Sequence, residues 1–145
     1  MPKRRRKRKP KERTWLFGCL AALLSAITII VIWQTHRLIV PWWGIAAVAA
    51  PWAGFDALLR HKQRTLGFER KCVDWWSVPH FFAGVLLGLF GVGVAFVAAI
   101  ACVWEVVEIY SNVREYPTNR VADVVLAIAG WAAANLVAGG PFPLV

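Results

Sequence analysis

Three groups of polar residues interrupt the apolar second half of the chain, and their residue types suit acid–base or metal chemistry. In chain order they are His80, the pair Glu105 and Glu108, and the trio Asn119, Arg120 and Asp123. Ionisable side chains are costly within apolar stretches, so each is a candidate for function. An imidazole with several carboxylates suits a divalent metal such as Zn²⁺, Mn²⁺ or iron. We therefore predict a polar cluster; no cofactor is required, but a divalent metal would use His80, Glu105 and Glu108.

Each polar group also has a structural explanation. His80 would serve as a histidine at the membrane interface. Glu105 and Glu108 lie on one side of a helix and would repel each other unless a cation, a metal or a shared proton intervened. They would otherwise mark a solvated helix end, and Arg120 with Asp123 would form an ion pair in the first turn of a helix. The sequence leaves these alternatives open.

Small residues share the helical faces of the polar groups. Gly84, Gly88 and Gly91 fall on the same face as His80 if this stretch is helical, and they include a G-x-x-x-G pattern. A second face of this kind, near the end of the chain, consists of Asp123, Ala127, Gly130 and Ala134. Such faces let two helices approach closely. We therefore expect the polar side chains to point into a helix bundle and not at lipid.

The apolar runs that carry these groups are long enough to cross a membrane. Of the 145 residues, 59% are hydrophobic, against about 45–50% in soluble domains, and a spanning helix needs about 20 apolar residues. We expect an all-α, polytopic membrane bundle that forms one domain over residues 15–138, with a short tail at 139–145. The expected helices lie at about 15–35, 38–59, 79–110 and 121–138.

The third apolar run, 79–110, has two interpretations. As one helix, the stretch from His80 to Glu105 is about 37 Å long at a rise of about 1.5 Å per residue, and the protein crosses the membrane four times. Alternatively, the Gly-Val-Gly sequence at 91–93 turns the chain into a hairpin, which brings His80 opposite Glu105. Limbs of about 11 residues are too short to span, so the hairpin would be re-entrant beside three crossings.

Basic residues are concentrated at the start of the chain. The formal net charge is +9, and residues 1–13 hold nine of the 17 Lys and Arg residues but one acid. Because positive segments flanking membrane helices stay in the cytoplasm, we expect a disordered cytoplasmic arm over residues 1–14. It would contact anionic lipid headgroups through Lys3, Arg4, Arg5, Arg6, Lys7, Arg8 and Lys9. Non-specific nucleic-acid binding is the alternative, but no feature predicts a specific nucleic-acid partner.

Three motifs in order carry a resemblance to known membrane proteins. They are Asp74-x5-His80-x3-Gly84, Trp104-Glu105-x2-Glu108 and Asn119-x3-Asp123-x6-Gly130. Over residues 74–135 the pattern resembles the VanZ-like proteins and, more closely, a related uncharacterised family of bacterial inner-membrane proteins. The resemblance implies a multi-pass protein of the bacterial plasma (inner) membrane. VanZ-like proteins are associated with glycopeptide resistance, and the closer family has no assigned activity.

Two departures from the family pattern matter. The separation between His80 and Glu105 is shorter than in those families, where two helices usually intervene, and this favours the hairpin. Ala127 stands where VanZ-like proteins usually carry an asparagine in the last helix, so no role of that asparagine transfers to this chain.

The chain lacks a recognisable catalytic motif. It has no Ser-His-Asp order, no H-E-x-x-H and no phosphate loop. We therefore expect a small polytopic plasma-membrane protein without catalysis of its own, related to the cell envelope. The alternatives are a membrane-embedded, metal- or acid/base-dependent enzyme acting on a lipid-linked substrate, and a proton-coupled transporter, which at this length would need to form a homo-oligomer.

Overall fold

The described part of the chain is helical throughout its regular structure. The computed structural model describes residues 14–35, 40–62, 72–111, 113 and 115–139. Within these ranges the helices are α1 (Thr14–Thr35), α2 (Trp42–Lys62), α3 (Ser77–Leu89), α4 (Val94–Tyr110) and α5 (Pro117–Ala138). The expected all-α class is confirmed. The basic arm, with its expected lipid contact at residues 3–9, lies outside the described residues, as does the tail from 140 onward.

The apolar run 79–110 forms two helices joined by a tight turn. α3 ends at Leu89, α4 begins at Val94, and Gly91 between them has a φ of 70°. Glycine adopts this conformation readily because it has no Cβ, and the chain can therefore reverse direction here. The expectation of a single helix is wrong, and the hairpin is the correct interpretation. Gly91 belongs to the turn and not to the helical packing face.

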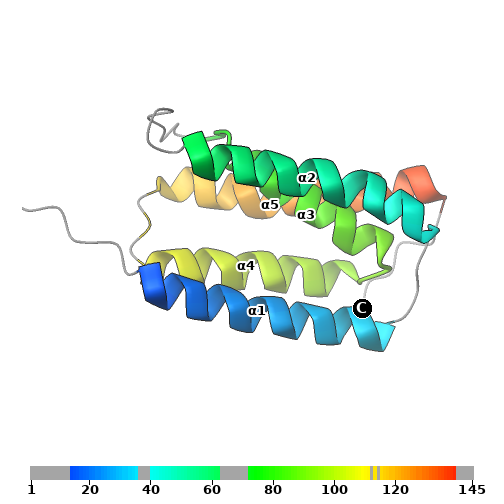
Figure 1. Cartoon of the computed structure of the whole chain (residues 1–145), viewed down its shortest axis with the longest axis horizontal. Helices are drawn as coiled ribbons and strands as arrows, with labels where there is room; N and C mark the ends of the chain where they lie inside the picture. The colour runs from blue at the N-terminus through cyan, green and yellow to red at the C-terminus, as the bar shows by residue number, and fades with distance from the viewer. Residues whose placement is uncertain (1–13, 36–39, 63–71, 112, 114, 140–145) are drawn as a thin grey trace, which may run out of the picture.

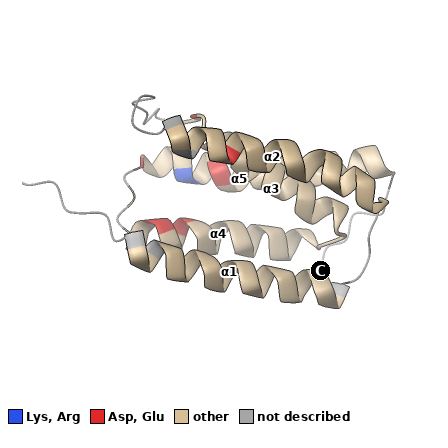
Figure 2. Ribbon diagram, viewed as in Figure 1, with Lys and Arg blue, Asp and Glu red and all other residues tan. Residues whose placement is uncertain are grey.

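The five described helices run alternately up and down the length of the bundle (Figure 1). α1 lies beside α4, while α2 and α5 both pack against α3, and α4 also contacts α5. One end of the bundle therefore holds the first residues of α1, α3 and α5 and the last residues of α2 and α4. We call it the polar end, because the described charged residues lie in this half of the bundle (Figure 2).

Glycines allow α3 and α5 to pack backbone against backbone. A Cβ atom added to Gly84 would lie 1.8 Å from the carbonyl oxygen of Ala127, and one added to Gly130 would lie 2.0 Å from that of Phe81. A Cβ on Gly88 would come within 2.8 Å of its nearest neighbouring atom. The two small-residue faces predicted from the sequence thus lie in one helix contact, which holds the starts of α3 and α5 together.

Two helix boundaries differ from those expected. α5 begins at Pro117, four residues before the expected start, because proline fits the first turn of a helix, where its missing N–H is not needed. α2 begins at Trp42, directly after Pro41, and continues to Lys62 with Pro51 inside it. The earlier start of α5 places Asn119 and Arg120 within the helix.

The main apolar core lies away from the polar end. It is built from Leu87, Val92, Val97 and Trp131, all of which are buried. The Trp131 indole N–H donates to the carbonyl oxygen of Val92 at 2.7 Å, so α5 also holds the α3–α4 turn in place.

Helix length gives a limited indication of membrane crossing. Among the described residues, α5 is the one helix that is long and apolar enough to span a bilayer by length and composition. The apolar stretch Gly18–Gln34 of α1 and the whole of α3 are shorter. A single helix of this kind is weak support for a membrane location.

Candidate functional site

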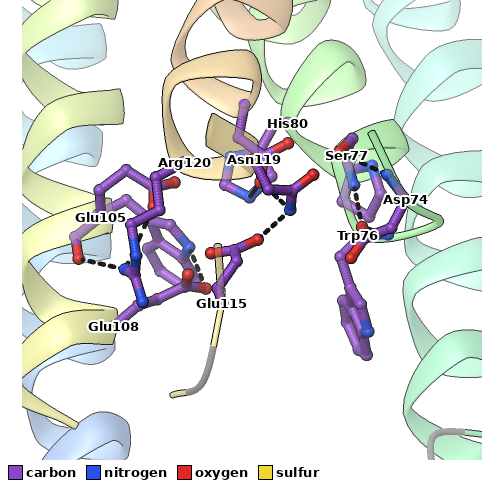
Figure 3. A network of polar contacts seen from close by, with 12 residues as sticks. Asp74, Trp76, Ser77, His80, Glu105, Glu108, Glu115, Asn119 and Arg120 are labelled. Carbon is purple, nitrogen blue, oxygen red and sulfur yellow. Dashed lines mark hydrogen bonds and ion pairs between the residues drawn. The ribbon is translucent and has the colours of Figure 1, made fainter. Parts of the chain in front are cut away.

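The candidate polar residues meet at the polar end of the bundle, although they come from three helices (Figure 3). The α3–α4 hairpin brings the start of α3, with His80, to the same end as the last turns of α4, with Glu105 and Glu108. α5 then starts at this end and contributes Asn119 and its neighbours. The antiparallel order of the helices is therefore what assembles the cluster.

His80, Glu105 and Asp123 form the first of two overlapping groups, which we call the histidine group. One potential ligand atom from each residue lies within 4.8 Å of the others, and His80 Nε2 is 3.8 Å from Asp123 Oδ2. Glu105 is 6% exposed and Asp123 is 1% exposed. Asp123, and not Glu108, lies in the group that contains the histidine, whereas Glu108 belongs to the second group.

The second group, the carboxylate group, consists of Glu105, Glu108 and Glu115, again within 4.8 Å of one another. Glu108 Oε1 accepts a hydrogen bond from the Trp104 indole N–H at 2.9 Å. Glu115 accepts a hydrogen bond from the side-chain amide of Asn119. Sequence reasoning missed Glu115. Its position four residues before Asn119 was the available signal, because a helical turn would place the two side chains together.

Arg120 connects α5 to α4 across this cluster. Its Nη1 lies 3.5 Å from Glu105 Oε2 and donates to the Glu105 carbonyl oxygen at 3.2 Å. Its Nη2 donates to the carbonyl oxygen of Val113 at 3.0 Å. Arg120 therefore pairs with Glu105, and the alternative of an ion pair with Asp123 at the helix start is wrong. The burial of Glu105 also contradicts the alternative of a solvated helix end.

Glu115 lies in the connection before α5, where its surroundings favour the protonated form. Burial raises the pKa of its carboxyl group above the usual range, and the carboxylates of Asp123 and Asp74 raise it further. The hydrogen bond from Asn119 and the charge of Arg120 act in the opposite direction. Acidic groups thus influence one another across the whole polar end.

Several buried oxygen atoms of the cluster receive no hydrogen bond from the described residues. They are both carboxylate oxygens of Glu105, Oε2 of Glu115, Oδ1 of Asn119 and Oδ1 of Asp123. Buried polar atoms are nearly always hydrogen-bonded, and leaving one unpaired costs about 1–3 kcal/mol. A cation or a proton held among these oxygens would relieve this cost.

Asp74 fixes the start of α3 and so the position of His80. Its Oδ1 accepts hydrogen bonds from the backbone N–H groups of Trp76 at 2.7 Å and Ser77 at 3.2 Å. In return, the Ser77 hydroxyl oxygen accepts a hydrogen bond from the Asp74 N–H at 3.2 Å. This reciprocal arrangement satisfies N–H groups that the first helical turn leaves free.

We expect Asp74→Ala to lower the free energy of unfolding by about 1–2 kcal/mol, because two N–H groups at the helix start lose their acceptor. Denaturant titration of the detergent-purified protein, followed by circular dichroism, measures the change. Ser25→Ala is the control: within the described part of the chain the exposed Ser25 hydroxyl donates to the Ala21 carbonyl of its own helix, and its loss should be nearly neutral. Equal stability of the two variants would contradict a capping role for Asp74.

Comparison with known proteins does not assign this site. No protein-family profile matches the chain, and no curated protein or solved structure matches it significantly. The chemistry of the polar end therefore has to be inferred from its own side chains. These are an imidazole and several carboxylates, some of whose oxygen atoms are buried without a hydrogen-bond donor among the described residues.

Proposed function

We propose that this protein is a multi-pass protein of the bacterial plasma membrane, and that its polar end faces the cytoplasm and acts as a binding centre without catalysis of its own. The observation that carries the proposal is the distribution of polarity. Among the described residues, the largest fully buried side chains are mostly polar, and they include Ser77, Asn119, Asp123 and Asn135. In soluble proteins such residues are mostly exposed, so a polar interior fits a bundle whose outside faces lipid.

The outside of the bundle supports the same proposal. Large apolar side chains are exposed on every described helix except α3, and the most exposed include Ile29, Leu136 and Val137. Exposed apolar patches of this extent are rare on soluble monomers. In a bilayer they would be the surface that contacts the hydrocarbon chains.

Exposed aromatic residues lie at both ends of the bundle. Trp15 and Trp33, at the two ends of α1, are 71% and 72% exposed, and they are about 27 Å apart at a rise of about 1.5 Å per residue. Trp42 lies at the same end of the bundle as Trp33, opposite the polar end. Trp75 and Tyr110 lie at the polar end. Tryptophan and tyrosine favour the two interfaces of a membrane, and the spacing fits a hydrocarbon layer of about 30 Å.

The proposed topology follows from the placement of the positive charges. The first residue of α1 lies at the polar end, and the nine basic residues of the arm directly precede it. By the positive-inside rule this end faces the cytoplasm. α1, α2 and α5 would then cross the membrane, and the α3–α4 hairpin would enter it from the cytoplasmic side. The end of α5 would face the other side.

The resemblance to the VanZ-like proteins supports a role at the cell envelope. The residues that carry the resemblance are separated in sequence, and His80, Glu105 and Asp123 among them meet in the histidine group. A shared pattern whose members gather at one place is more typical of a common binding centre than of three independent structural motifs.

The topology is tested by labelling single cysteines in intact cells with a membrane-impermeant thiol reagent. Two variants keep one cysteine at the polar end, the native Cys72 or Thr118→Cys, and a third keeps Pro41→Cys at the opposite end; all three positions are exposed. We expect Pro41→Cys to react in intact cells and the other two only after permeabilisation. Reaction of Thr118→Cys in intact cells, or of all three alike, would contradict the proposed topology.

A further inference from the structure

We infer that the histidine group binds one divalent transition-metal ion, with His80, Glu105 and Asp123 as its protein ligands. The inference deepens the proposed function, because it names the ligand of the binding centre. It rests on the proposal that the polar end is a binding centre. It does not depend on the direction in which the helices cross the membrane.

The geometry of the group is close to that of a metal site. The three potential ligand atoms lie within 4.8 Å of one another, while ligands at about 2.1 Å from one ion in a tetrahedral site are about 3.4 Å apart. Rotation of the side chains by about an ångström at their tips would bring the three atoms to this spacing. Because the residues come from α3, α4 and α5, the bound ion would join all three helices.

Buried oxygen atoms without donors point to a positive ligand at this place. Asp123 Oδ1 and both carboxylate oxygens of Glu105 receive no hydrogen bond from the described part of the chain, although both residues are more than nine-tenths buried. Arg120 supplies a positive charge 3.5 Å from Glu105 Oε2, but Asp123 pairs, among the described residues, with the imidazole of His80. A carboxylate shielded from water in this way needs a cation or a proton. His80 lies beside these oxygens, and an imidazole nitrogen is a common metal ligand.

The histidine group is a better metal site than the carboxylate group. In the carboxylate group, Glu108 already accepts a hydrogen bond from Trp104, and Glu115 accepts one from Asn119. The guanidinium of Arg120 lies 3.5 Å from Glu105 Oε2. This charge already balances that of Glu105, whereas Asp123 of the histidine group pairs, among the described residues, with the imidazole of His80.

The ligand types narrow the choice of ion. Ca²⁺ and Mg²⁺ prefer sites made of oxygen atoms alone, whereas an imidazole nitrogen together with two carboxylates suits Mn²⁺, Fe²⁺ or Zn²⁺. With three protein ligands, coordination positions would remain for water or for an oxygen of a further ligand, such as a phosphate group at the membrane surface.

Metal binding is tested on the full-length protein, purified in detergent and stripped with a chelator. The protein is loaded separately with Mn²⁺ and with Zn²⁺, desalted, and analysed for metal per chain. We expect about one ion per chain in the wild type, and at least a tenfold weaker affinity in His80→Ala and Asp123→Asn. The matched control, His61→Ala on the exposed face of α2, should bind like the wild type.

A measurement on the wild type alone tests the metal site even if the variants do not fold. Pulsed electron paramagnetic resonance of the Mn²⁺-loaded protein should show coupling to one imidazole nitrogen. Absence of this coupling, absence of bound metal in the wild type, or equal binding in His80→Ala and His61→Ala would each overturn the metal site. Because cysteine labelling reports the topology separately, a failure here would be distinguishable from a failure of the proposed membrane arrangement.

Discussion

Replacing Gly84 with alanine should lower the free energy of unfolding by about 3 kcal/mol or more, at or above the upper end of the usual cost of overpacking. The new Cβ would lie 1.8 Å from the carbonyl oxygen of Ala127, and a backbone atom within a packed helix cannot move aside alone. α3 and α5 would have to separate, and this would also move His80 away from Asp123. Thermal and denaturant unfolding in detergent measure the loss.

Gly54→Ala is the matched control for this substitution. Gly54 lies in α2, and a Cβ placed there meets no atom within 4 Å. Alanine favours a helix over glycine by about 0.5–1 kcal/mol, so this variant should be as stable as the wild type or slightly more stable. A Gly84→Ala protein that unfolds like Gly54→Ala would show that α3 and α5 are not in close contact.

The second large effect is expected at Arg120. Arg120→Met removes the positive charge beside Glu105 and the hydrogen bonds to the carbonyl oxygens of Glu105 and Val113. Removing one partner of a buried ion pair leaves the other charge uncompensated and typically costs about 3–5 kcal/mol. We therefore expect the free energy of unfolding to fall by an amount in this range, measured by the same unfolding titrations.

A double-mutant cycle separates the charge from the hydrogen bonds. Combining Arg120→Met with Glu105→Gln removes both charges, and most of the lost stability should return. Arg120→Lys keeps the charge, but its single ammonium group cannot reproduce the planar fork that reaches two carbonyl oxygens, so its loss should be intermediate. If the double variant is as unstable as the sum of the two single variants, the ion pair does not contribute as argued.

The hairpin shows how far hydropathy alone could predict this fold. Both limbs of the run 79–110 are apolar, so an average over a window does not distinguish one long helix from two short ones. The Gly-Val-Gly sequence at 91–93 made the turn an explicit alternative, and the short separation from His80 to Glu105 favoured it. What decided the structure is the pairing of α3 with α5 through Gly84 and Gly130, a contact between distant segments.

Most residues of the candidate site were predicted from the sequence, but Glu115 and the grouping of the residues were not. His80, Glu105 and Asp123 were identifiable because charged residues are conspicuous within apolar runs. Spacing along one helix cannot show which residue of another helix lies opposite, so Glu108 was expected where the structure places Asp123. Glu115 was not predicted because acids are ordinary in a polar connection, and its proximity to Glu105 and Glu108 depends on the packing of separate segments.

The shortness of α3 has a consequence for the biosynthesis of the protein in the proposed membrane arrangement. With 13 residues, α3 is too short to insert by itself, so it must enter the bilayer together with α4 as one unit. Glu105 would then reach the membrane before Arg120 has been synthesised, because Arg120 belongs to the last helix. A nascent chain that lacks α5 would carry unneutralised carboxylates, which would distinguish it from the finished protein for cellular quality control.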